Sequence, residues 1–257
     1  MIDPEVLGLP SCPRNIKLTI EYDGAGYCGW EKQKNGVGIQ QLIEDAVFKI
    51  TGERTTLNGS GRTDAGVHAL GQVASFTLQH KIPIHDLGRA IDAVLPEDIA
   101  VVKAEEVDLF FHARFSATSK LYRYSVLTGR SKAPLLRRQT YHVRFPLDIP
   151  AMQEAAALFV GTHDYSAFCK EAERIGDCVR TMHQCEVIVD GRCIHFELAA
   201  SGFLYNMVRI IVGTLVYVGC GKLSAAQISE LLEGGERKFS GPTVPACGLH
   251  LVEVFYG

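Results

Sequence analysis

The chain has 257 residues, 47% of them hydrophobic and 21% charged, which is the balance of a globular protein that can bury a sizeable core. Its 26 basic and 29 acidic residues give a formal net charge of −3, which over the whole chain argues against a nucleic-acid partner. The longest strongly apolar uncharged run, 210–221, is too short to span a bilayer, and Met1–Pro13 does not resemble a signal peptide. The eight cysteines include no C-x-x-C pair, so we expect buried thiols and a soluble, cytoplasmic protein.

The first half of the chain predicts two strands and two helices after a proline-containing leader at 1–14, which we expect to be mobile. Alternating polar and apolar residues predict strands, and apolar residues at helical spacing predict helices. The expected elements are strands at 16–22 and 72–78 and helices at 40–50 and from Asp86 to a point before Pro96. Gly52 stands where the first helix ends, and Asp86 is expected to cap the second.

The second half resumes the pattern near residue 110. The expected elements are a strand at 121–127, a helix from Asp148 to about Val160, hairpin strands at 183–189 and 192–198, helices at 207–218 and from Ser224 to Gly234, and a closing strand at 249–256. The hairpin turn is expected at Asp190-Gly191, and Ser224 with Gln227 forms a capping box. This irregular alternation predicts a mixed α/β protein of the α+β type rather than a doubly wound parallel sheet. No linker is apparent, so the two halves are expected to share a core.

The densest chemical motif is the loop Gly59–His68. Its three glycines permit a close approach of backbone to a ligand. It is not a phosphate-binding P-loop, because no lysine follows a glycine, and it is not a dinucleotide fingerprint, because Asp64 occupies the place of the third glycine. The loop is either a glycine-rich turn with solvated charges or the support of a nucleophilic carboxylate, Asp64, that Arg62 keeps ionised.

Two further motifs combine aromatic and basic residues. Tyr122 and Tyr124 share one face of a predicted strand, beside Lys120. They are either core tyrosines or an aromatic platform for a base, with basic residues nearby to hold phosphates. The motif Ser201–Arg209 leads into the apolar helix. Arg209 is either a surface residue or, if buried, one that requires a carboxylate or phosphate partner.

Two histidines and two cysteines of the predicted hairpin are candidate zinc ligands. With the turn as predicted, Cys185 faces Phe196, so His183 and Cys185 project from one side of the hairpin and Cys193 and His195 from the other. Four ligands on opposite faces cannot form a tetrahedral site, so we expect no zinc here.

The motif Gly61–Ala69 resembles the signature of the TruA family of tRNA pseudouridine synthases. Other segments are similar to that family's remaining motifs in the same order, and together they cover nearly the whole chain from Asn15 onward. These segments are 21–30, 111–117 with 120–124, 203–209, and the ending from Gly248. One departure is Glu31, where the family pattern has glutamine after the tryptophan; it leaves the catalytic assignment untouched.

The resemblance implies an isomerase that converts uridine to pseudouridine at positions 38, 39 and 40, in the anticodon stem-loop of tRNA. The N-glycosidic bond breaks, the uracil rotates, and its C5 joins the ribose C1′. By match to the motif, Asp64 is the nucleophile. It attacks C1′, attacks C6 of the base, or assists a glycal route, and the sequence leaves these three open. No cofactor or metal is implied.

The resemblance also implies roles for residues outside that loop. Tyr122 is similar to the tyrosine that stacks on the uracil, Arg209 to an arginine that pairs with Asp64, and Arg62 to an arginine that helps to extrude the base. The residues implied to bind substrate are Tyr122, Arg114, Lys120, Arg123 and Leu204. Water must be excluded from the reacting centre, and the candidates for this apolar wall are Val67, Phe203 and Leu204.

The fold implied is the pseudouridine synthase fold, in which two ferredoxin-like halves share one mostly antiparallel sheet with the active cleft between them. In this chain the halves are 15–110, which carries the Asp64 loop, and 111–257. A homodimer that contacts one tRNA with both protomers is implied as well. Two alternatives remain open: a nucleoside or glycoside hydrolase that uses Asp64, and a non-catalytic RNA-binding module, which is less favoured because no aromatic RNP signature is present.

The charge is unevenly distributed along the chain. The segment 109–147 has no acidic residue and eight basic ones, whereas the rest has 18 basic and 29 acidic residues. The basic residues of this segment are Arg114, Lys120, Arg123, Arg130, Lys132, Arg137, Arg138 and Arg144. We therefore expect a basic groove on an otherwise acidic body, able to steer tRNA despite the negative total.

Overall fold

The computed structural model describes residues 13–34 and 36–257, so most of the expected leader at 1–14 lies outside the described residues. The chain forms two compact units. Unit 1 contains the described residues up to Ala117 together with Tyr256–Gly257, and unit 2 contains Thr118–Phe255. The division expected at residue 110, and the sheet and cleft expected to join the halves, stay predictions.

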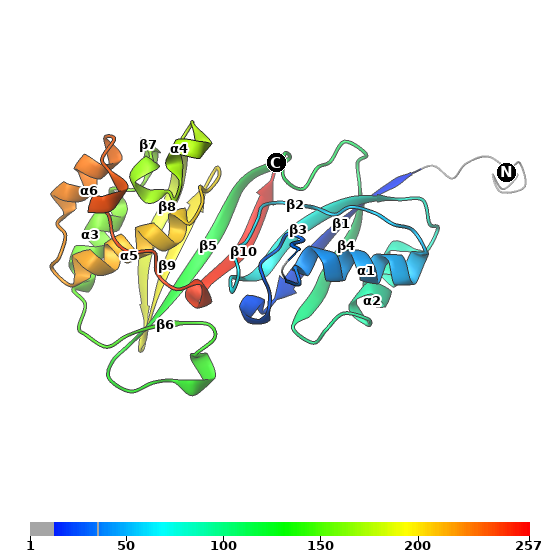
Figure 1. The fold of residues 1–257 in the computed structure, drawn as a ribbon, viewed down its shortest axis with the longest axis horizontal. Coiled ribbons are helices and arrows are strands. Elements are labelled where there is room, and N and C mark those ends of the chain that lie inside the picture. The colour runs from blue at the N-terminus through cyan, green and yellow to red at the C-terminus, as the bar shows by residue number, and fades with distance from the viewer. Residues whose placement is uncertain (1–12, 35) are drawn as a thin grey trace, which may run out of the picture. The chain divides into compact units, whose positions relative to one another are not determined.

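Unit 1 is an antiparallel sheet accompanied by two helices (Figure 1). Its elements are β1 (Arg14–Tyr22), the 3-10 turn η2 (Gly24–Gly26), α1 (Ile39–Thr51), β2 (Asn58–Gly59), β3 (His68–Leu78), α2 (Ile84–Asp92) and β4 (Ile99–Val107). β1 lies between β4 and β3, and β2 extends the edge of β3. α2 packs on β4 and contacts α1, so the buried residues Ile16, Leu18 and Ile20 of β1 belong to a core that both helices help to close.

The end of α1 confirms its prediction. Gly52 has a φ of 73°, and its N–H donates to the Phe48 carbonyl at 2.8 Å. Glycine adopts this left-handed conformation without steric strain, so it ends the helix where the periodicity ends. The expected cap of α2 is wrong, because Pro83 is the N-cap. Asp86 lies in the first turn, where its negative charge interacts favourably with the positive end of the helix dipole.

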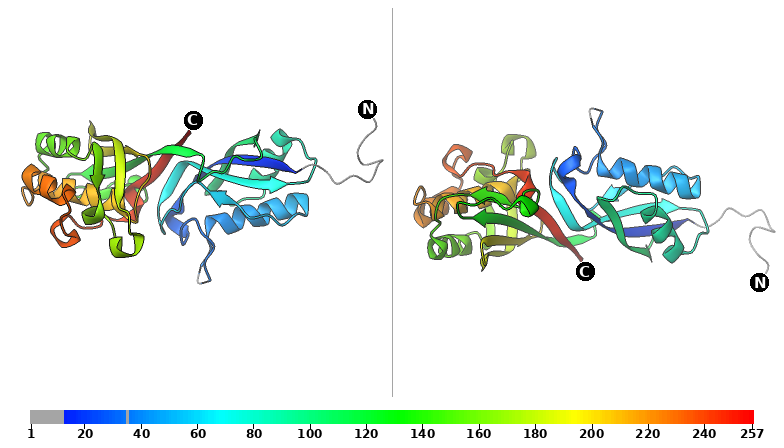
Figure 2. Two further views of the ribbon diagram at one scale, coloured as in Figure 1. Left: turned by 90° about the horizontal axis from the view of Figure 1, so that it is seen from above. Right: turned by 90° about the horizontal axis from the view of Figure 1, so that it is seen from below.

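Unit 2 holds the remaining strands and helices. Its elements are β5 (Ala117–Thr128), η3 (Pro134–Leu136), β6 (Tyr141–Val143), α3 (Ile149–Ala157), β7 (Gly161–Asp164), η4 (Ser166–Phe168), α4 (Ala172–Ile175), β8 (Val179–Asp190), β9 (Cys193–Ala200), α5 (Met207–Gly219), α6 (Ala225–Leu232), η5 (Arg237–Phe239), η6 (Ala246–Gly248) and β10 (Leu249–Tyr256). The strand order is β10-β5-β9-β8-β7, with β6 parallel to β5. α3 contacts α5, α6 and β8 and so ties these helices to the sheet (Figure 2).

Capping residues set the helix boundaries of unit 2 as the sequence predicts. Asp148 accepts a hydrogen bond from the Ala151 N–H at 3.1 Å at the start of α3. Ser224 and Gln227 form both bonds of the capping box of α6. α3 ends at Ala157, earlier than expected, because Gly161 with a φ of 123° opens strand β7 instead of ending the helix.

The β8–β9 hairpin turns one residue later than predicted. Asp190 pairs with Cys193, so the turn is Gly191-Arg192 and Cys185 faces Leu198 rather than Phe196. Cys185 projects from one face with the buried residues of the hairpin, whereas Cys193 projects from the other, because side chains alternate along a strand. Within residues 13–34 and 36–257, no three His, Cys, Asp or Glu residues are grouped so as to hold a metal ion.

Both units thus combine antiparallel strands with packed helices, which confirms the expected α+β class. Over the described part of the chain, no helix has the length and apolar character needed to cross a membrane. In the same residues all seven cysteines are free thiols: Cys169, Cys178 and Cys185 are buried, and the other four are half-buried. The prediction of buried thiols is therefore confirmed for three of them.

Candidate active site

Asp64 lies in the loop that joins β2 to β3 in unit 1. Its carbonyl accepts a hydrogen bond from the Val67 N–H at 3.1 Å, which closes a tight turn. The third residue of that turn, Gly66, has a φ of 77°, which glycine adopts without strain. The Asp64 side chain is half-buried, so the turn holds a carboxylate in a defined position while leaving part of it accessible.

Gln72, fully buried on β3, holds the first part of the same loop. Its amide nitrogen donates to the Gly61 carbonyl at 3.0 Å, and its amide oxygen accepts from the Ser60 hydroxyl at 2.6 Å. Gln72 lies outside the motifs that the sequence indicates. The signal that identifies it is an amide side chain in the middle of a mostly apolar strand, because a buried polar group requires hydrogen-bond partners.

Replacement of Gln72 by leucine should loosen this loop. The Gly61 carbonyl loses its amide donor, so we expect the free energy of unfolding to fall by about 1–3 kcal/mol. Denaturant unfolding measures the loss, and Gln79→Leu, at an exposed position just after β3, is the matched control. A Gln72→Leu protein as stable as the control would show that this amide does not hold the loop.

The loop 23–30 packs against both ends of the Asp64 turn. A Cβ atom on Gly29, whose φ is 97°, would lie 2.5 Å from the Thr63 carbonyl oxygen. The Trp30 N–H donates to that carbonyl at 3.0 Å. A Cβ atom on Gly24 would lie 1.9 Å from the Val67 carbonyl oxygen. The two glycines are therefore required where the two backbones approach, and they explain why the N-terminal motif accompanies the Asp64 motif.

A buried phenol supports the residue next to Asp64. Tyr22 and Thr63 share a hydrogen bond of 2.8 Å between their hydroxyl oxygens, and both side chains are buried. Burial raises the pKa of Tyr22 to about 12, so the phenol stays neutral and keeps its hydrogen at neutral pH. Thr63 is thereby fixed through its side chain as well as through its carbonyl.

Arg62 points to solvent and forms an ion pair with Glu31. Glu31 is the position at which this chain departs from the family pattern. Both side chains are well exposed, at 76% and 42% respectively, so the pair contributes little to stability and separates readily. Arg62 is therefore an accessible cation two residues from Asp64.

Tyr122 and Tyr124 lie on the same face of β5 in unit 2 but have different surroundings. The Tyr124 ring is fully buried and its hydroxyl donates to the Pro245 carbonyl at 2.8 Å, so the core interpretation applies to it. Tyr122 is 8% exposed and meets the Phe203 ring edge to face, with centroids 5.0 Å apart. Leu204, next in the chain, is buried as well. Tyr122 therefore contacts one of the residues expected to exclude water, Phe203.

Arg209 is half-buried in the first turn of α5, and its guanidinium is oriented by two neighbours. Nη1 donates to the Asn206 side-chain oxygen at 2.7 Å, and Nε donates to the Val244 carbonyl at 2.8 Å. Asn206 has a φ of 60°, a conformation that asparagine tolerates better than most residues. The sequence does not predict this role of Asn206. The residue meets Arg209 because it is the N-cap of α5, which begins at the next residue.

The other residues expected to bind substrate are dispersed. Lys120 is half-buried on β5, opposite Ala200 of β9. Arg123 donates to the Glu197 carboxylate at 2.7 and 2.9 Å, so its charge is already compensated. Arg114 is exposed in unit 1 and lies over the Phe115 ring. Of these three cations, Arg114 is the exposed one, whereas Lys120 and Arg123 are half-buried.

Comparison with known proteins decides the family. A family profile described as tRNA pseudouridine synthase matches residues 18–116 and 155–257. The chain belongs to the tRNA pseudouridine synthase family. It is 49% identical over 243 residues to the tRNA pseudouridine synthase A of Acetivibrio thermocellus, with 95% of this chain and 100% of that protein covered. It is 46% identical over 244 residues to the protein of the same name from Citrifermentans bemidjiense, with 95% and 98% covered.

A solved archaeal box H/ACA ribonucleoprotein complex is a remote structural neighbour of this family member. It is 12% identical, with a TM-score of 0.30, and the match covers 92% of this chain and 46% of that one. The family match itself includes Arg62, Asp64 and Arg209, whereas Tyr122 lies between the two matched ranges. Membership makes the protein an isomerase whose substrate is tRNA.

Proposed function

We propose that this pseudouridine synthase isomerises uridine at positions 38, 39 and 40, in the anticodon stem-loop of tRNA, with Asp64 as nucleophile. The observation that carries the proposal is the half-buried carboxylate of Asp64 in a tight turn, held by hydrogen bonds and by glycine contacts on both sides. Such a carboxylate is positioned before substrate arrives, which is what a nucleophile or an electrostatic stabiliser requires.

Asp64 acts at the bond between ribose and base. Cleavage of a glycosidic bond develops positive charge at C1′, which a nearby carboxylate stabilises or traps. Attack on C1′, attack on C6 and assistance to a glycal intermediate all use the same carboxylate. In each route the N1–C1′ bond breaks, the C5–C1′ bond forms, and the proton on C5 leaves to water.

The remaining site residues are proposed to bind the flipped nucleotide or to orient Asp64. Removal of the uridine from its stack costs about a few kcal/mol, and Arg62 is proposed to stabilise the extruded state. Tyr122 is proposed to stack on the uracil, in surroundings that Phe203 and Leu204 keep apolar. Arg209 is proposed to orient Asp64 and keep it charged, with Asn206 and Val244 holding its guanidinium in place.

The two alternative functions differ in their products. A hydrolase that uses Asp64 yields free uracil, and an RNA-binding module yields no product. With tRNA that carries tritium at C5 of its uracils, an isomerase releases tritium to water and no free base. That assay, run beside a binding assay, separates the three functions.

We also propose that the protein is a homodimer in which one tRNA contacts both protomers, as the family resemblance implies. Recognition then depends on the shape and phosphates of the stem-loop more than on base edges, since adjacent uridines are all accepted. Light scattering should give twice the monomer mass of 28.2 kDa. A monomer that modifies tRNA at full rate would contradict this part of the proposal.

Salt should weaken tRNA binding. The acid-free segment 109–147 carries eight basic residues, and each phosphate contact adds about −0.7 to −0.9 to the slope of log affinity against log salt. We expect a total slope steeper than about −3, reduced by about one unit in Lys132→Ala. Fluorescence anisotropy with labelled tRNA measures the slope, and Lys49→Ala, on the exposed side of α1, should leave it unchanged. A slope near zero would mean that this segment does not bind RNA.

A further inference from the structure

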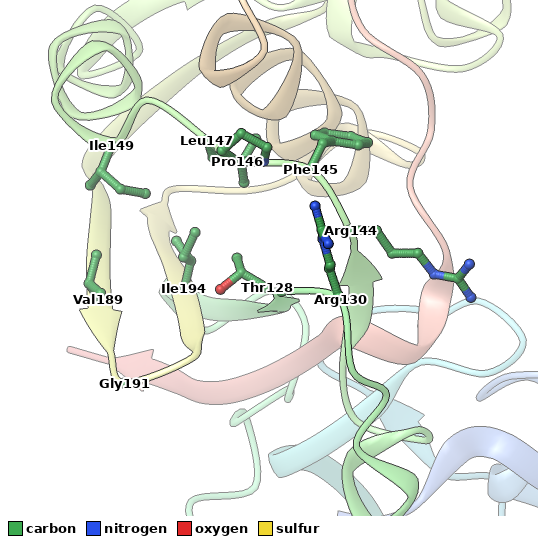
Figure 3. A pocket seen from close by; sticks show the side chains of 11 residues that line it. Thr128, Arg130, Arg144, Phe145, Pro146, Leu147, Ile149, Val189, Gly191 and Ile194 are labelled. Atoms are coloured by element: carbon green, nitrogen blue, oxygen red, sulfur yellow. The ribbon is translucent and has the colours of Figure 1, made fainter.

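A pocket of about 440 Å³ lies in unit 2 at the end of β5, between the tip of the β8–β9 hairpin and the stretch that leads into α3 (Figure 3). One side of it is apolar and formed by Ile149, Val189 and Ile194. The other side carries Arg130, and Arg144 lies at the rim, where its side chain extends away from the apolar wall. The pocket therefore has one wall suited to an apolar group and one suited to an anion.

The basic wall is fixed by the hairpin tip. Arg192 donates through Nε to the Thr128 carbonyl at 3.3 Å and through Nη2 to the Ser131 carbonyl. In return, the Thr128 N–H and hydroxyl donate to the Arg192 carbonyl at 2.8 and 2.9 Å. His142 donates a hydrogen bond through Nε2 to the Gly129 carbonyl at 2.7 Å. The backbone that carries Arg130 is therefore held in place without help from any ligand.

The two arginines, of the wall and of the rim, keep their charge uncompensated. Among the described residues, neither Arg130 nor Arg144 forms an ion pair or hydrogen bond, whereas Arg123 in the same unit is paired with Glu197. None of the described residues that line the pocket is acidic. Asp190, at the hairpin tip, lies next to the lining residue Val189 and so projects from the opposite face of the strand. Asp148, between the lining residues Leu147 and Ile149, has its carboxylate engaged by the Ala151 N–H at the start of α3. An anion that enters therefore meets a positively charged lining.

The volume and the two walls select the class of ligand. Pockets for small ligands range over about 300–1,000 Å³, so a nucleotide fits. An apolar partner would bury both unpaired guanidinium groups, which is unfavourable. A second copy of this chain is disfavoured as well, because it would bring two basic segments together. Figure 3 shows Arg130 pointing towards Phe145 and Pro146, the lining residues best suited to contact a planar base.

We propose that this pocket binds a nucleotide unit, with its phosphate on Arg130, its base against the apolar wall and Phe145, and Arg144 at the rim adding positive charge to the entrance. Thr128 lies six residues along β5 from Tyr122, which is about 20 Å in a strand. The nucleotide held here is therefore not the uridine that reacts. The inference rests on the proposed tRNA substrate for its source, which is a second nucleotide of the bound tRNA; a free mononucleotide shares the same chemistry.

The test compares two double variants and one single variant. Arg130→Ala/Arg144→Ala removes the phosphate contact and the positive charge at the rim, Phe145→Ala removes a half-exposed ring of the pocket, and Lys49→Ala/Arg89→Ala removes two exposed charges from α1 and α2 of unit 1. Thermal unfolding checks that each variant is folded. Each is then titrated with a tRNA transcript and, separately, with uridine 5′-monophosphate.

We expect the dissociation constant for tRNA to rise at least about tenfold in Arg130→Ala/Arg144→Ala and at least about threefold in Phe145→Ala, and to change less in the control pair. The loss should appear in KM rather than in kcat for tritium release. Saturable binding of uridine 5′-monophosphate that the arginine pair variant loses, without a change in tRNA affinity, would support the pocket and assign it a free nucleotide.

Three results would overturn the inference. One is an arginine pair variant that binds both probes like the control pair. Another is a rise in the dissociation constant in the arginine pair variant with no change in Phe145→Ala, which would indicate general electrostatic attraction rather than binding in the pocket. The third is a change in oligomeric state in Phe145→Ala, which assigns the surface to protein contacts. If the wild type releases no tritium, the proposed function is wrong. The binding titrations still test the pocket independently of that result.

Discussion

Replacement of Asp64 by asparagine should reduce tritium release from C5-labelled tRNA by at least about 10⁴-fold, the scale on which enzymes lose kcat when one member of the catalytic machinery is removed. Asparagine has the shape of aspartate but carries no negative charge and is a poor nucleophile. The turn at Gly66 and the bonds from Gln72 do not depend on the carboxylate, so the loop should keep its conformation. The dissociation constant for tRNA should change by less than about threefold.

Asp45→Asn is the matched control for this variant. Asp45 is an exposed carboxylate on α1 of the same unit, so its replacement removes one charge at a distance from the Asp64 loop. It should keep wild-type tritium release. If Asp64→Asn were as active as this control, Asp64 would not be the nucleophile and the proposed mechanism would be wrong.

Replacement of Gly29 by alanine should destabilise unit 1 and impair the reaction together. The new Cβ atom would lie 2.5 Å from the Thr63 carbonyl oxygen and 3.1 Å from the Asp64 carbonyl carbon, and the φ of 97° is strained for alanine. Left-handed strain and overpacking each cost about 1–3 kcal/mol, so the free energy of unfolding should fall by about 2–5 kcal/mol. Because the atoms displaced are the backbone of the Asp64 turn, kcat should fall even in the fraction that stays folded.

Gly26→Ala is the control from the same loop, because a Cβ atom on Gly26 has no other atom within 4 Å. Its unfolding free energy and activity should match the wild type. Denaturant unfolding and the tritium assay measure both variants. Equal stability of the two variants would contradict the close packing of the loop 23–30 against the Asp64 turn.

The sequence predicts elements well where the signal is local. Gly52 ends α1, the Ser224–Gln227 box starts α6, and β10 has the predicted bounds, because each depends on residues within one turn or on simple alternation. β4 was not predicted, since its exposed, charged residues dilute the alternation and it is held by pairing with β1. The hairpin turn lies one residue later than predicted, because Asp190 pairs as a strand residue, and each cross-strand partner is therefore displaced by two residues.

The candidate site shows the same difference between local signals and tertiary contacts. Residue types and the family resemblance single out Asp64, Tyr122 and Arg209, whereas their supports come from contacts across the sequence. Gln72 reaches back to Gly61, and Val244 meets Arg209 from a segment 35 residues away. Such partners are fixed by tertiary packing, so a single sequence predicts the reacting groups more readily than the groups that orient them.

The charge of the whole chain is the wrong scale for judging its partner. The net value of −3 argues against RNA, but the acid-free segment 109–147 concentrates eight basic residues, and the nucleotide pocket proposed above lies partly within it. Local charge decides association because the field of a protein is screened within about 8–10 Å at physiological salt. An acidic body is therefore compatible with a tRNA substrate.

The decisive experiment follows the tritium label and the uracil base in one reaction. The wild-type protein is incubated with a tRNA transcript that carries tritium at C5 of its uracils, and tritium in water and free uracil are measured at completion. We expect tritium release that matches the pseudouridine formed at positions 38, 39 and 40, with no free uracil. Free uracil in step with uridine loss, or no release from a tRNA that the protein binds, would contradict it.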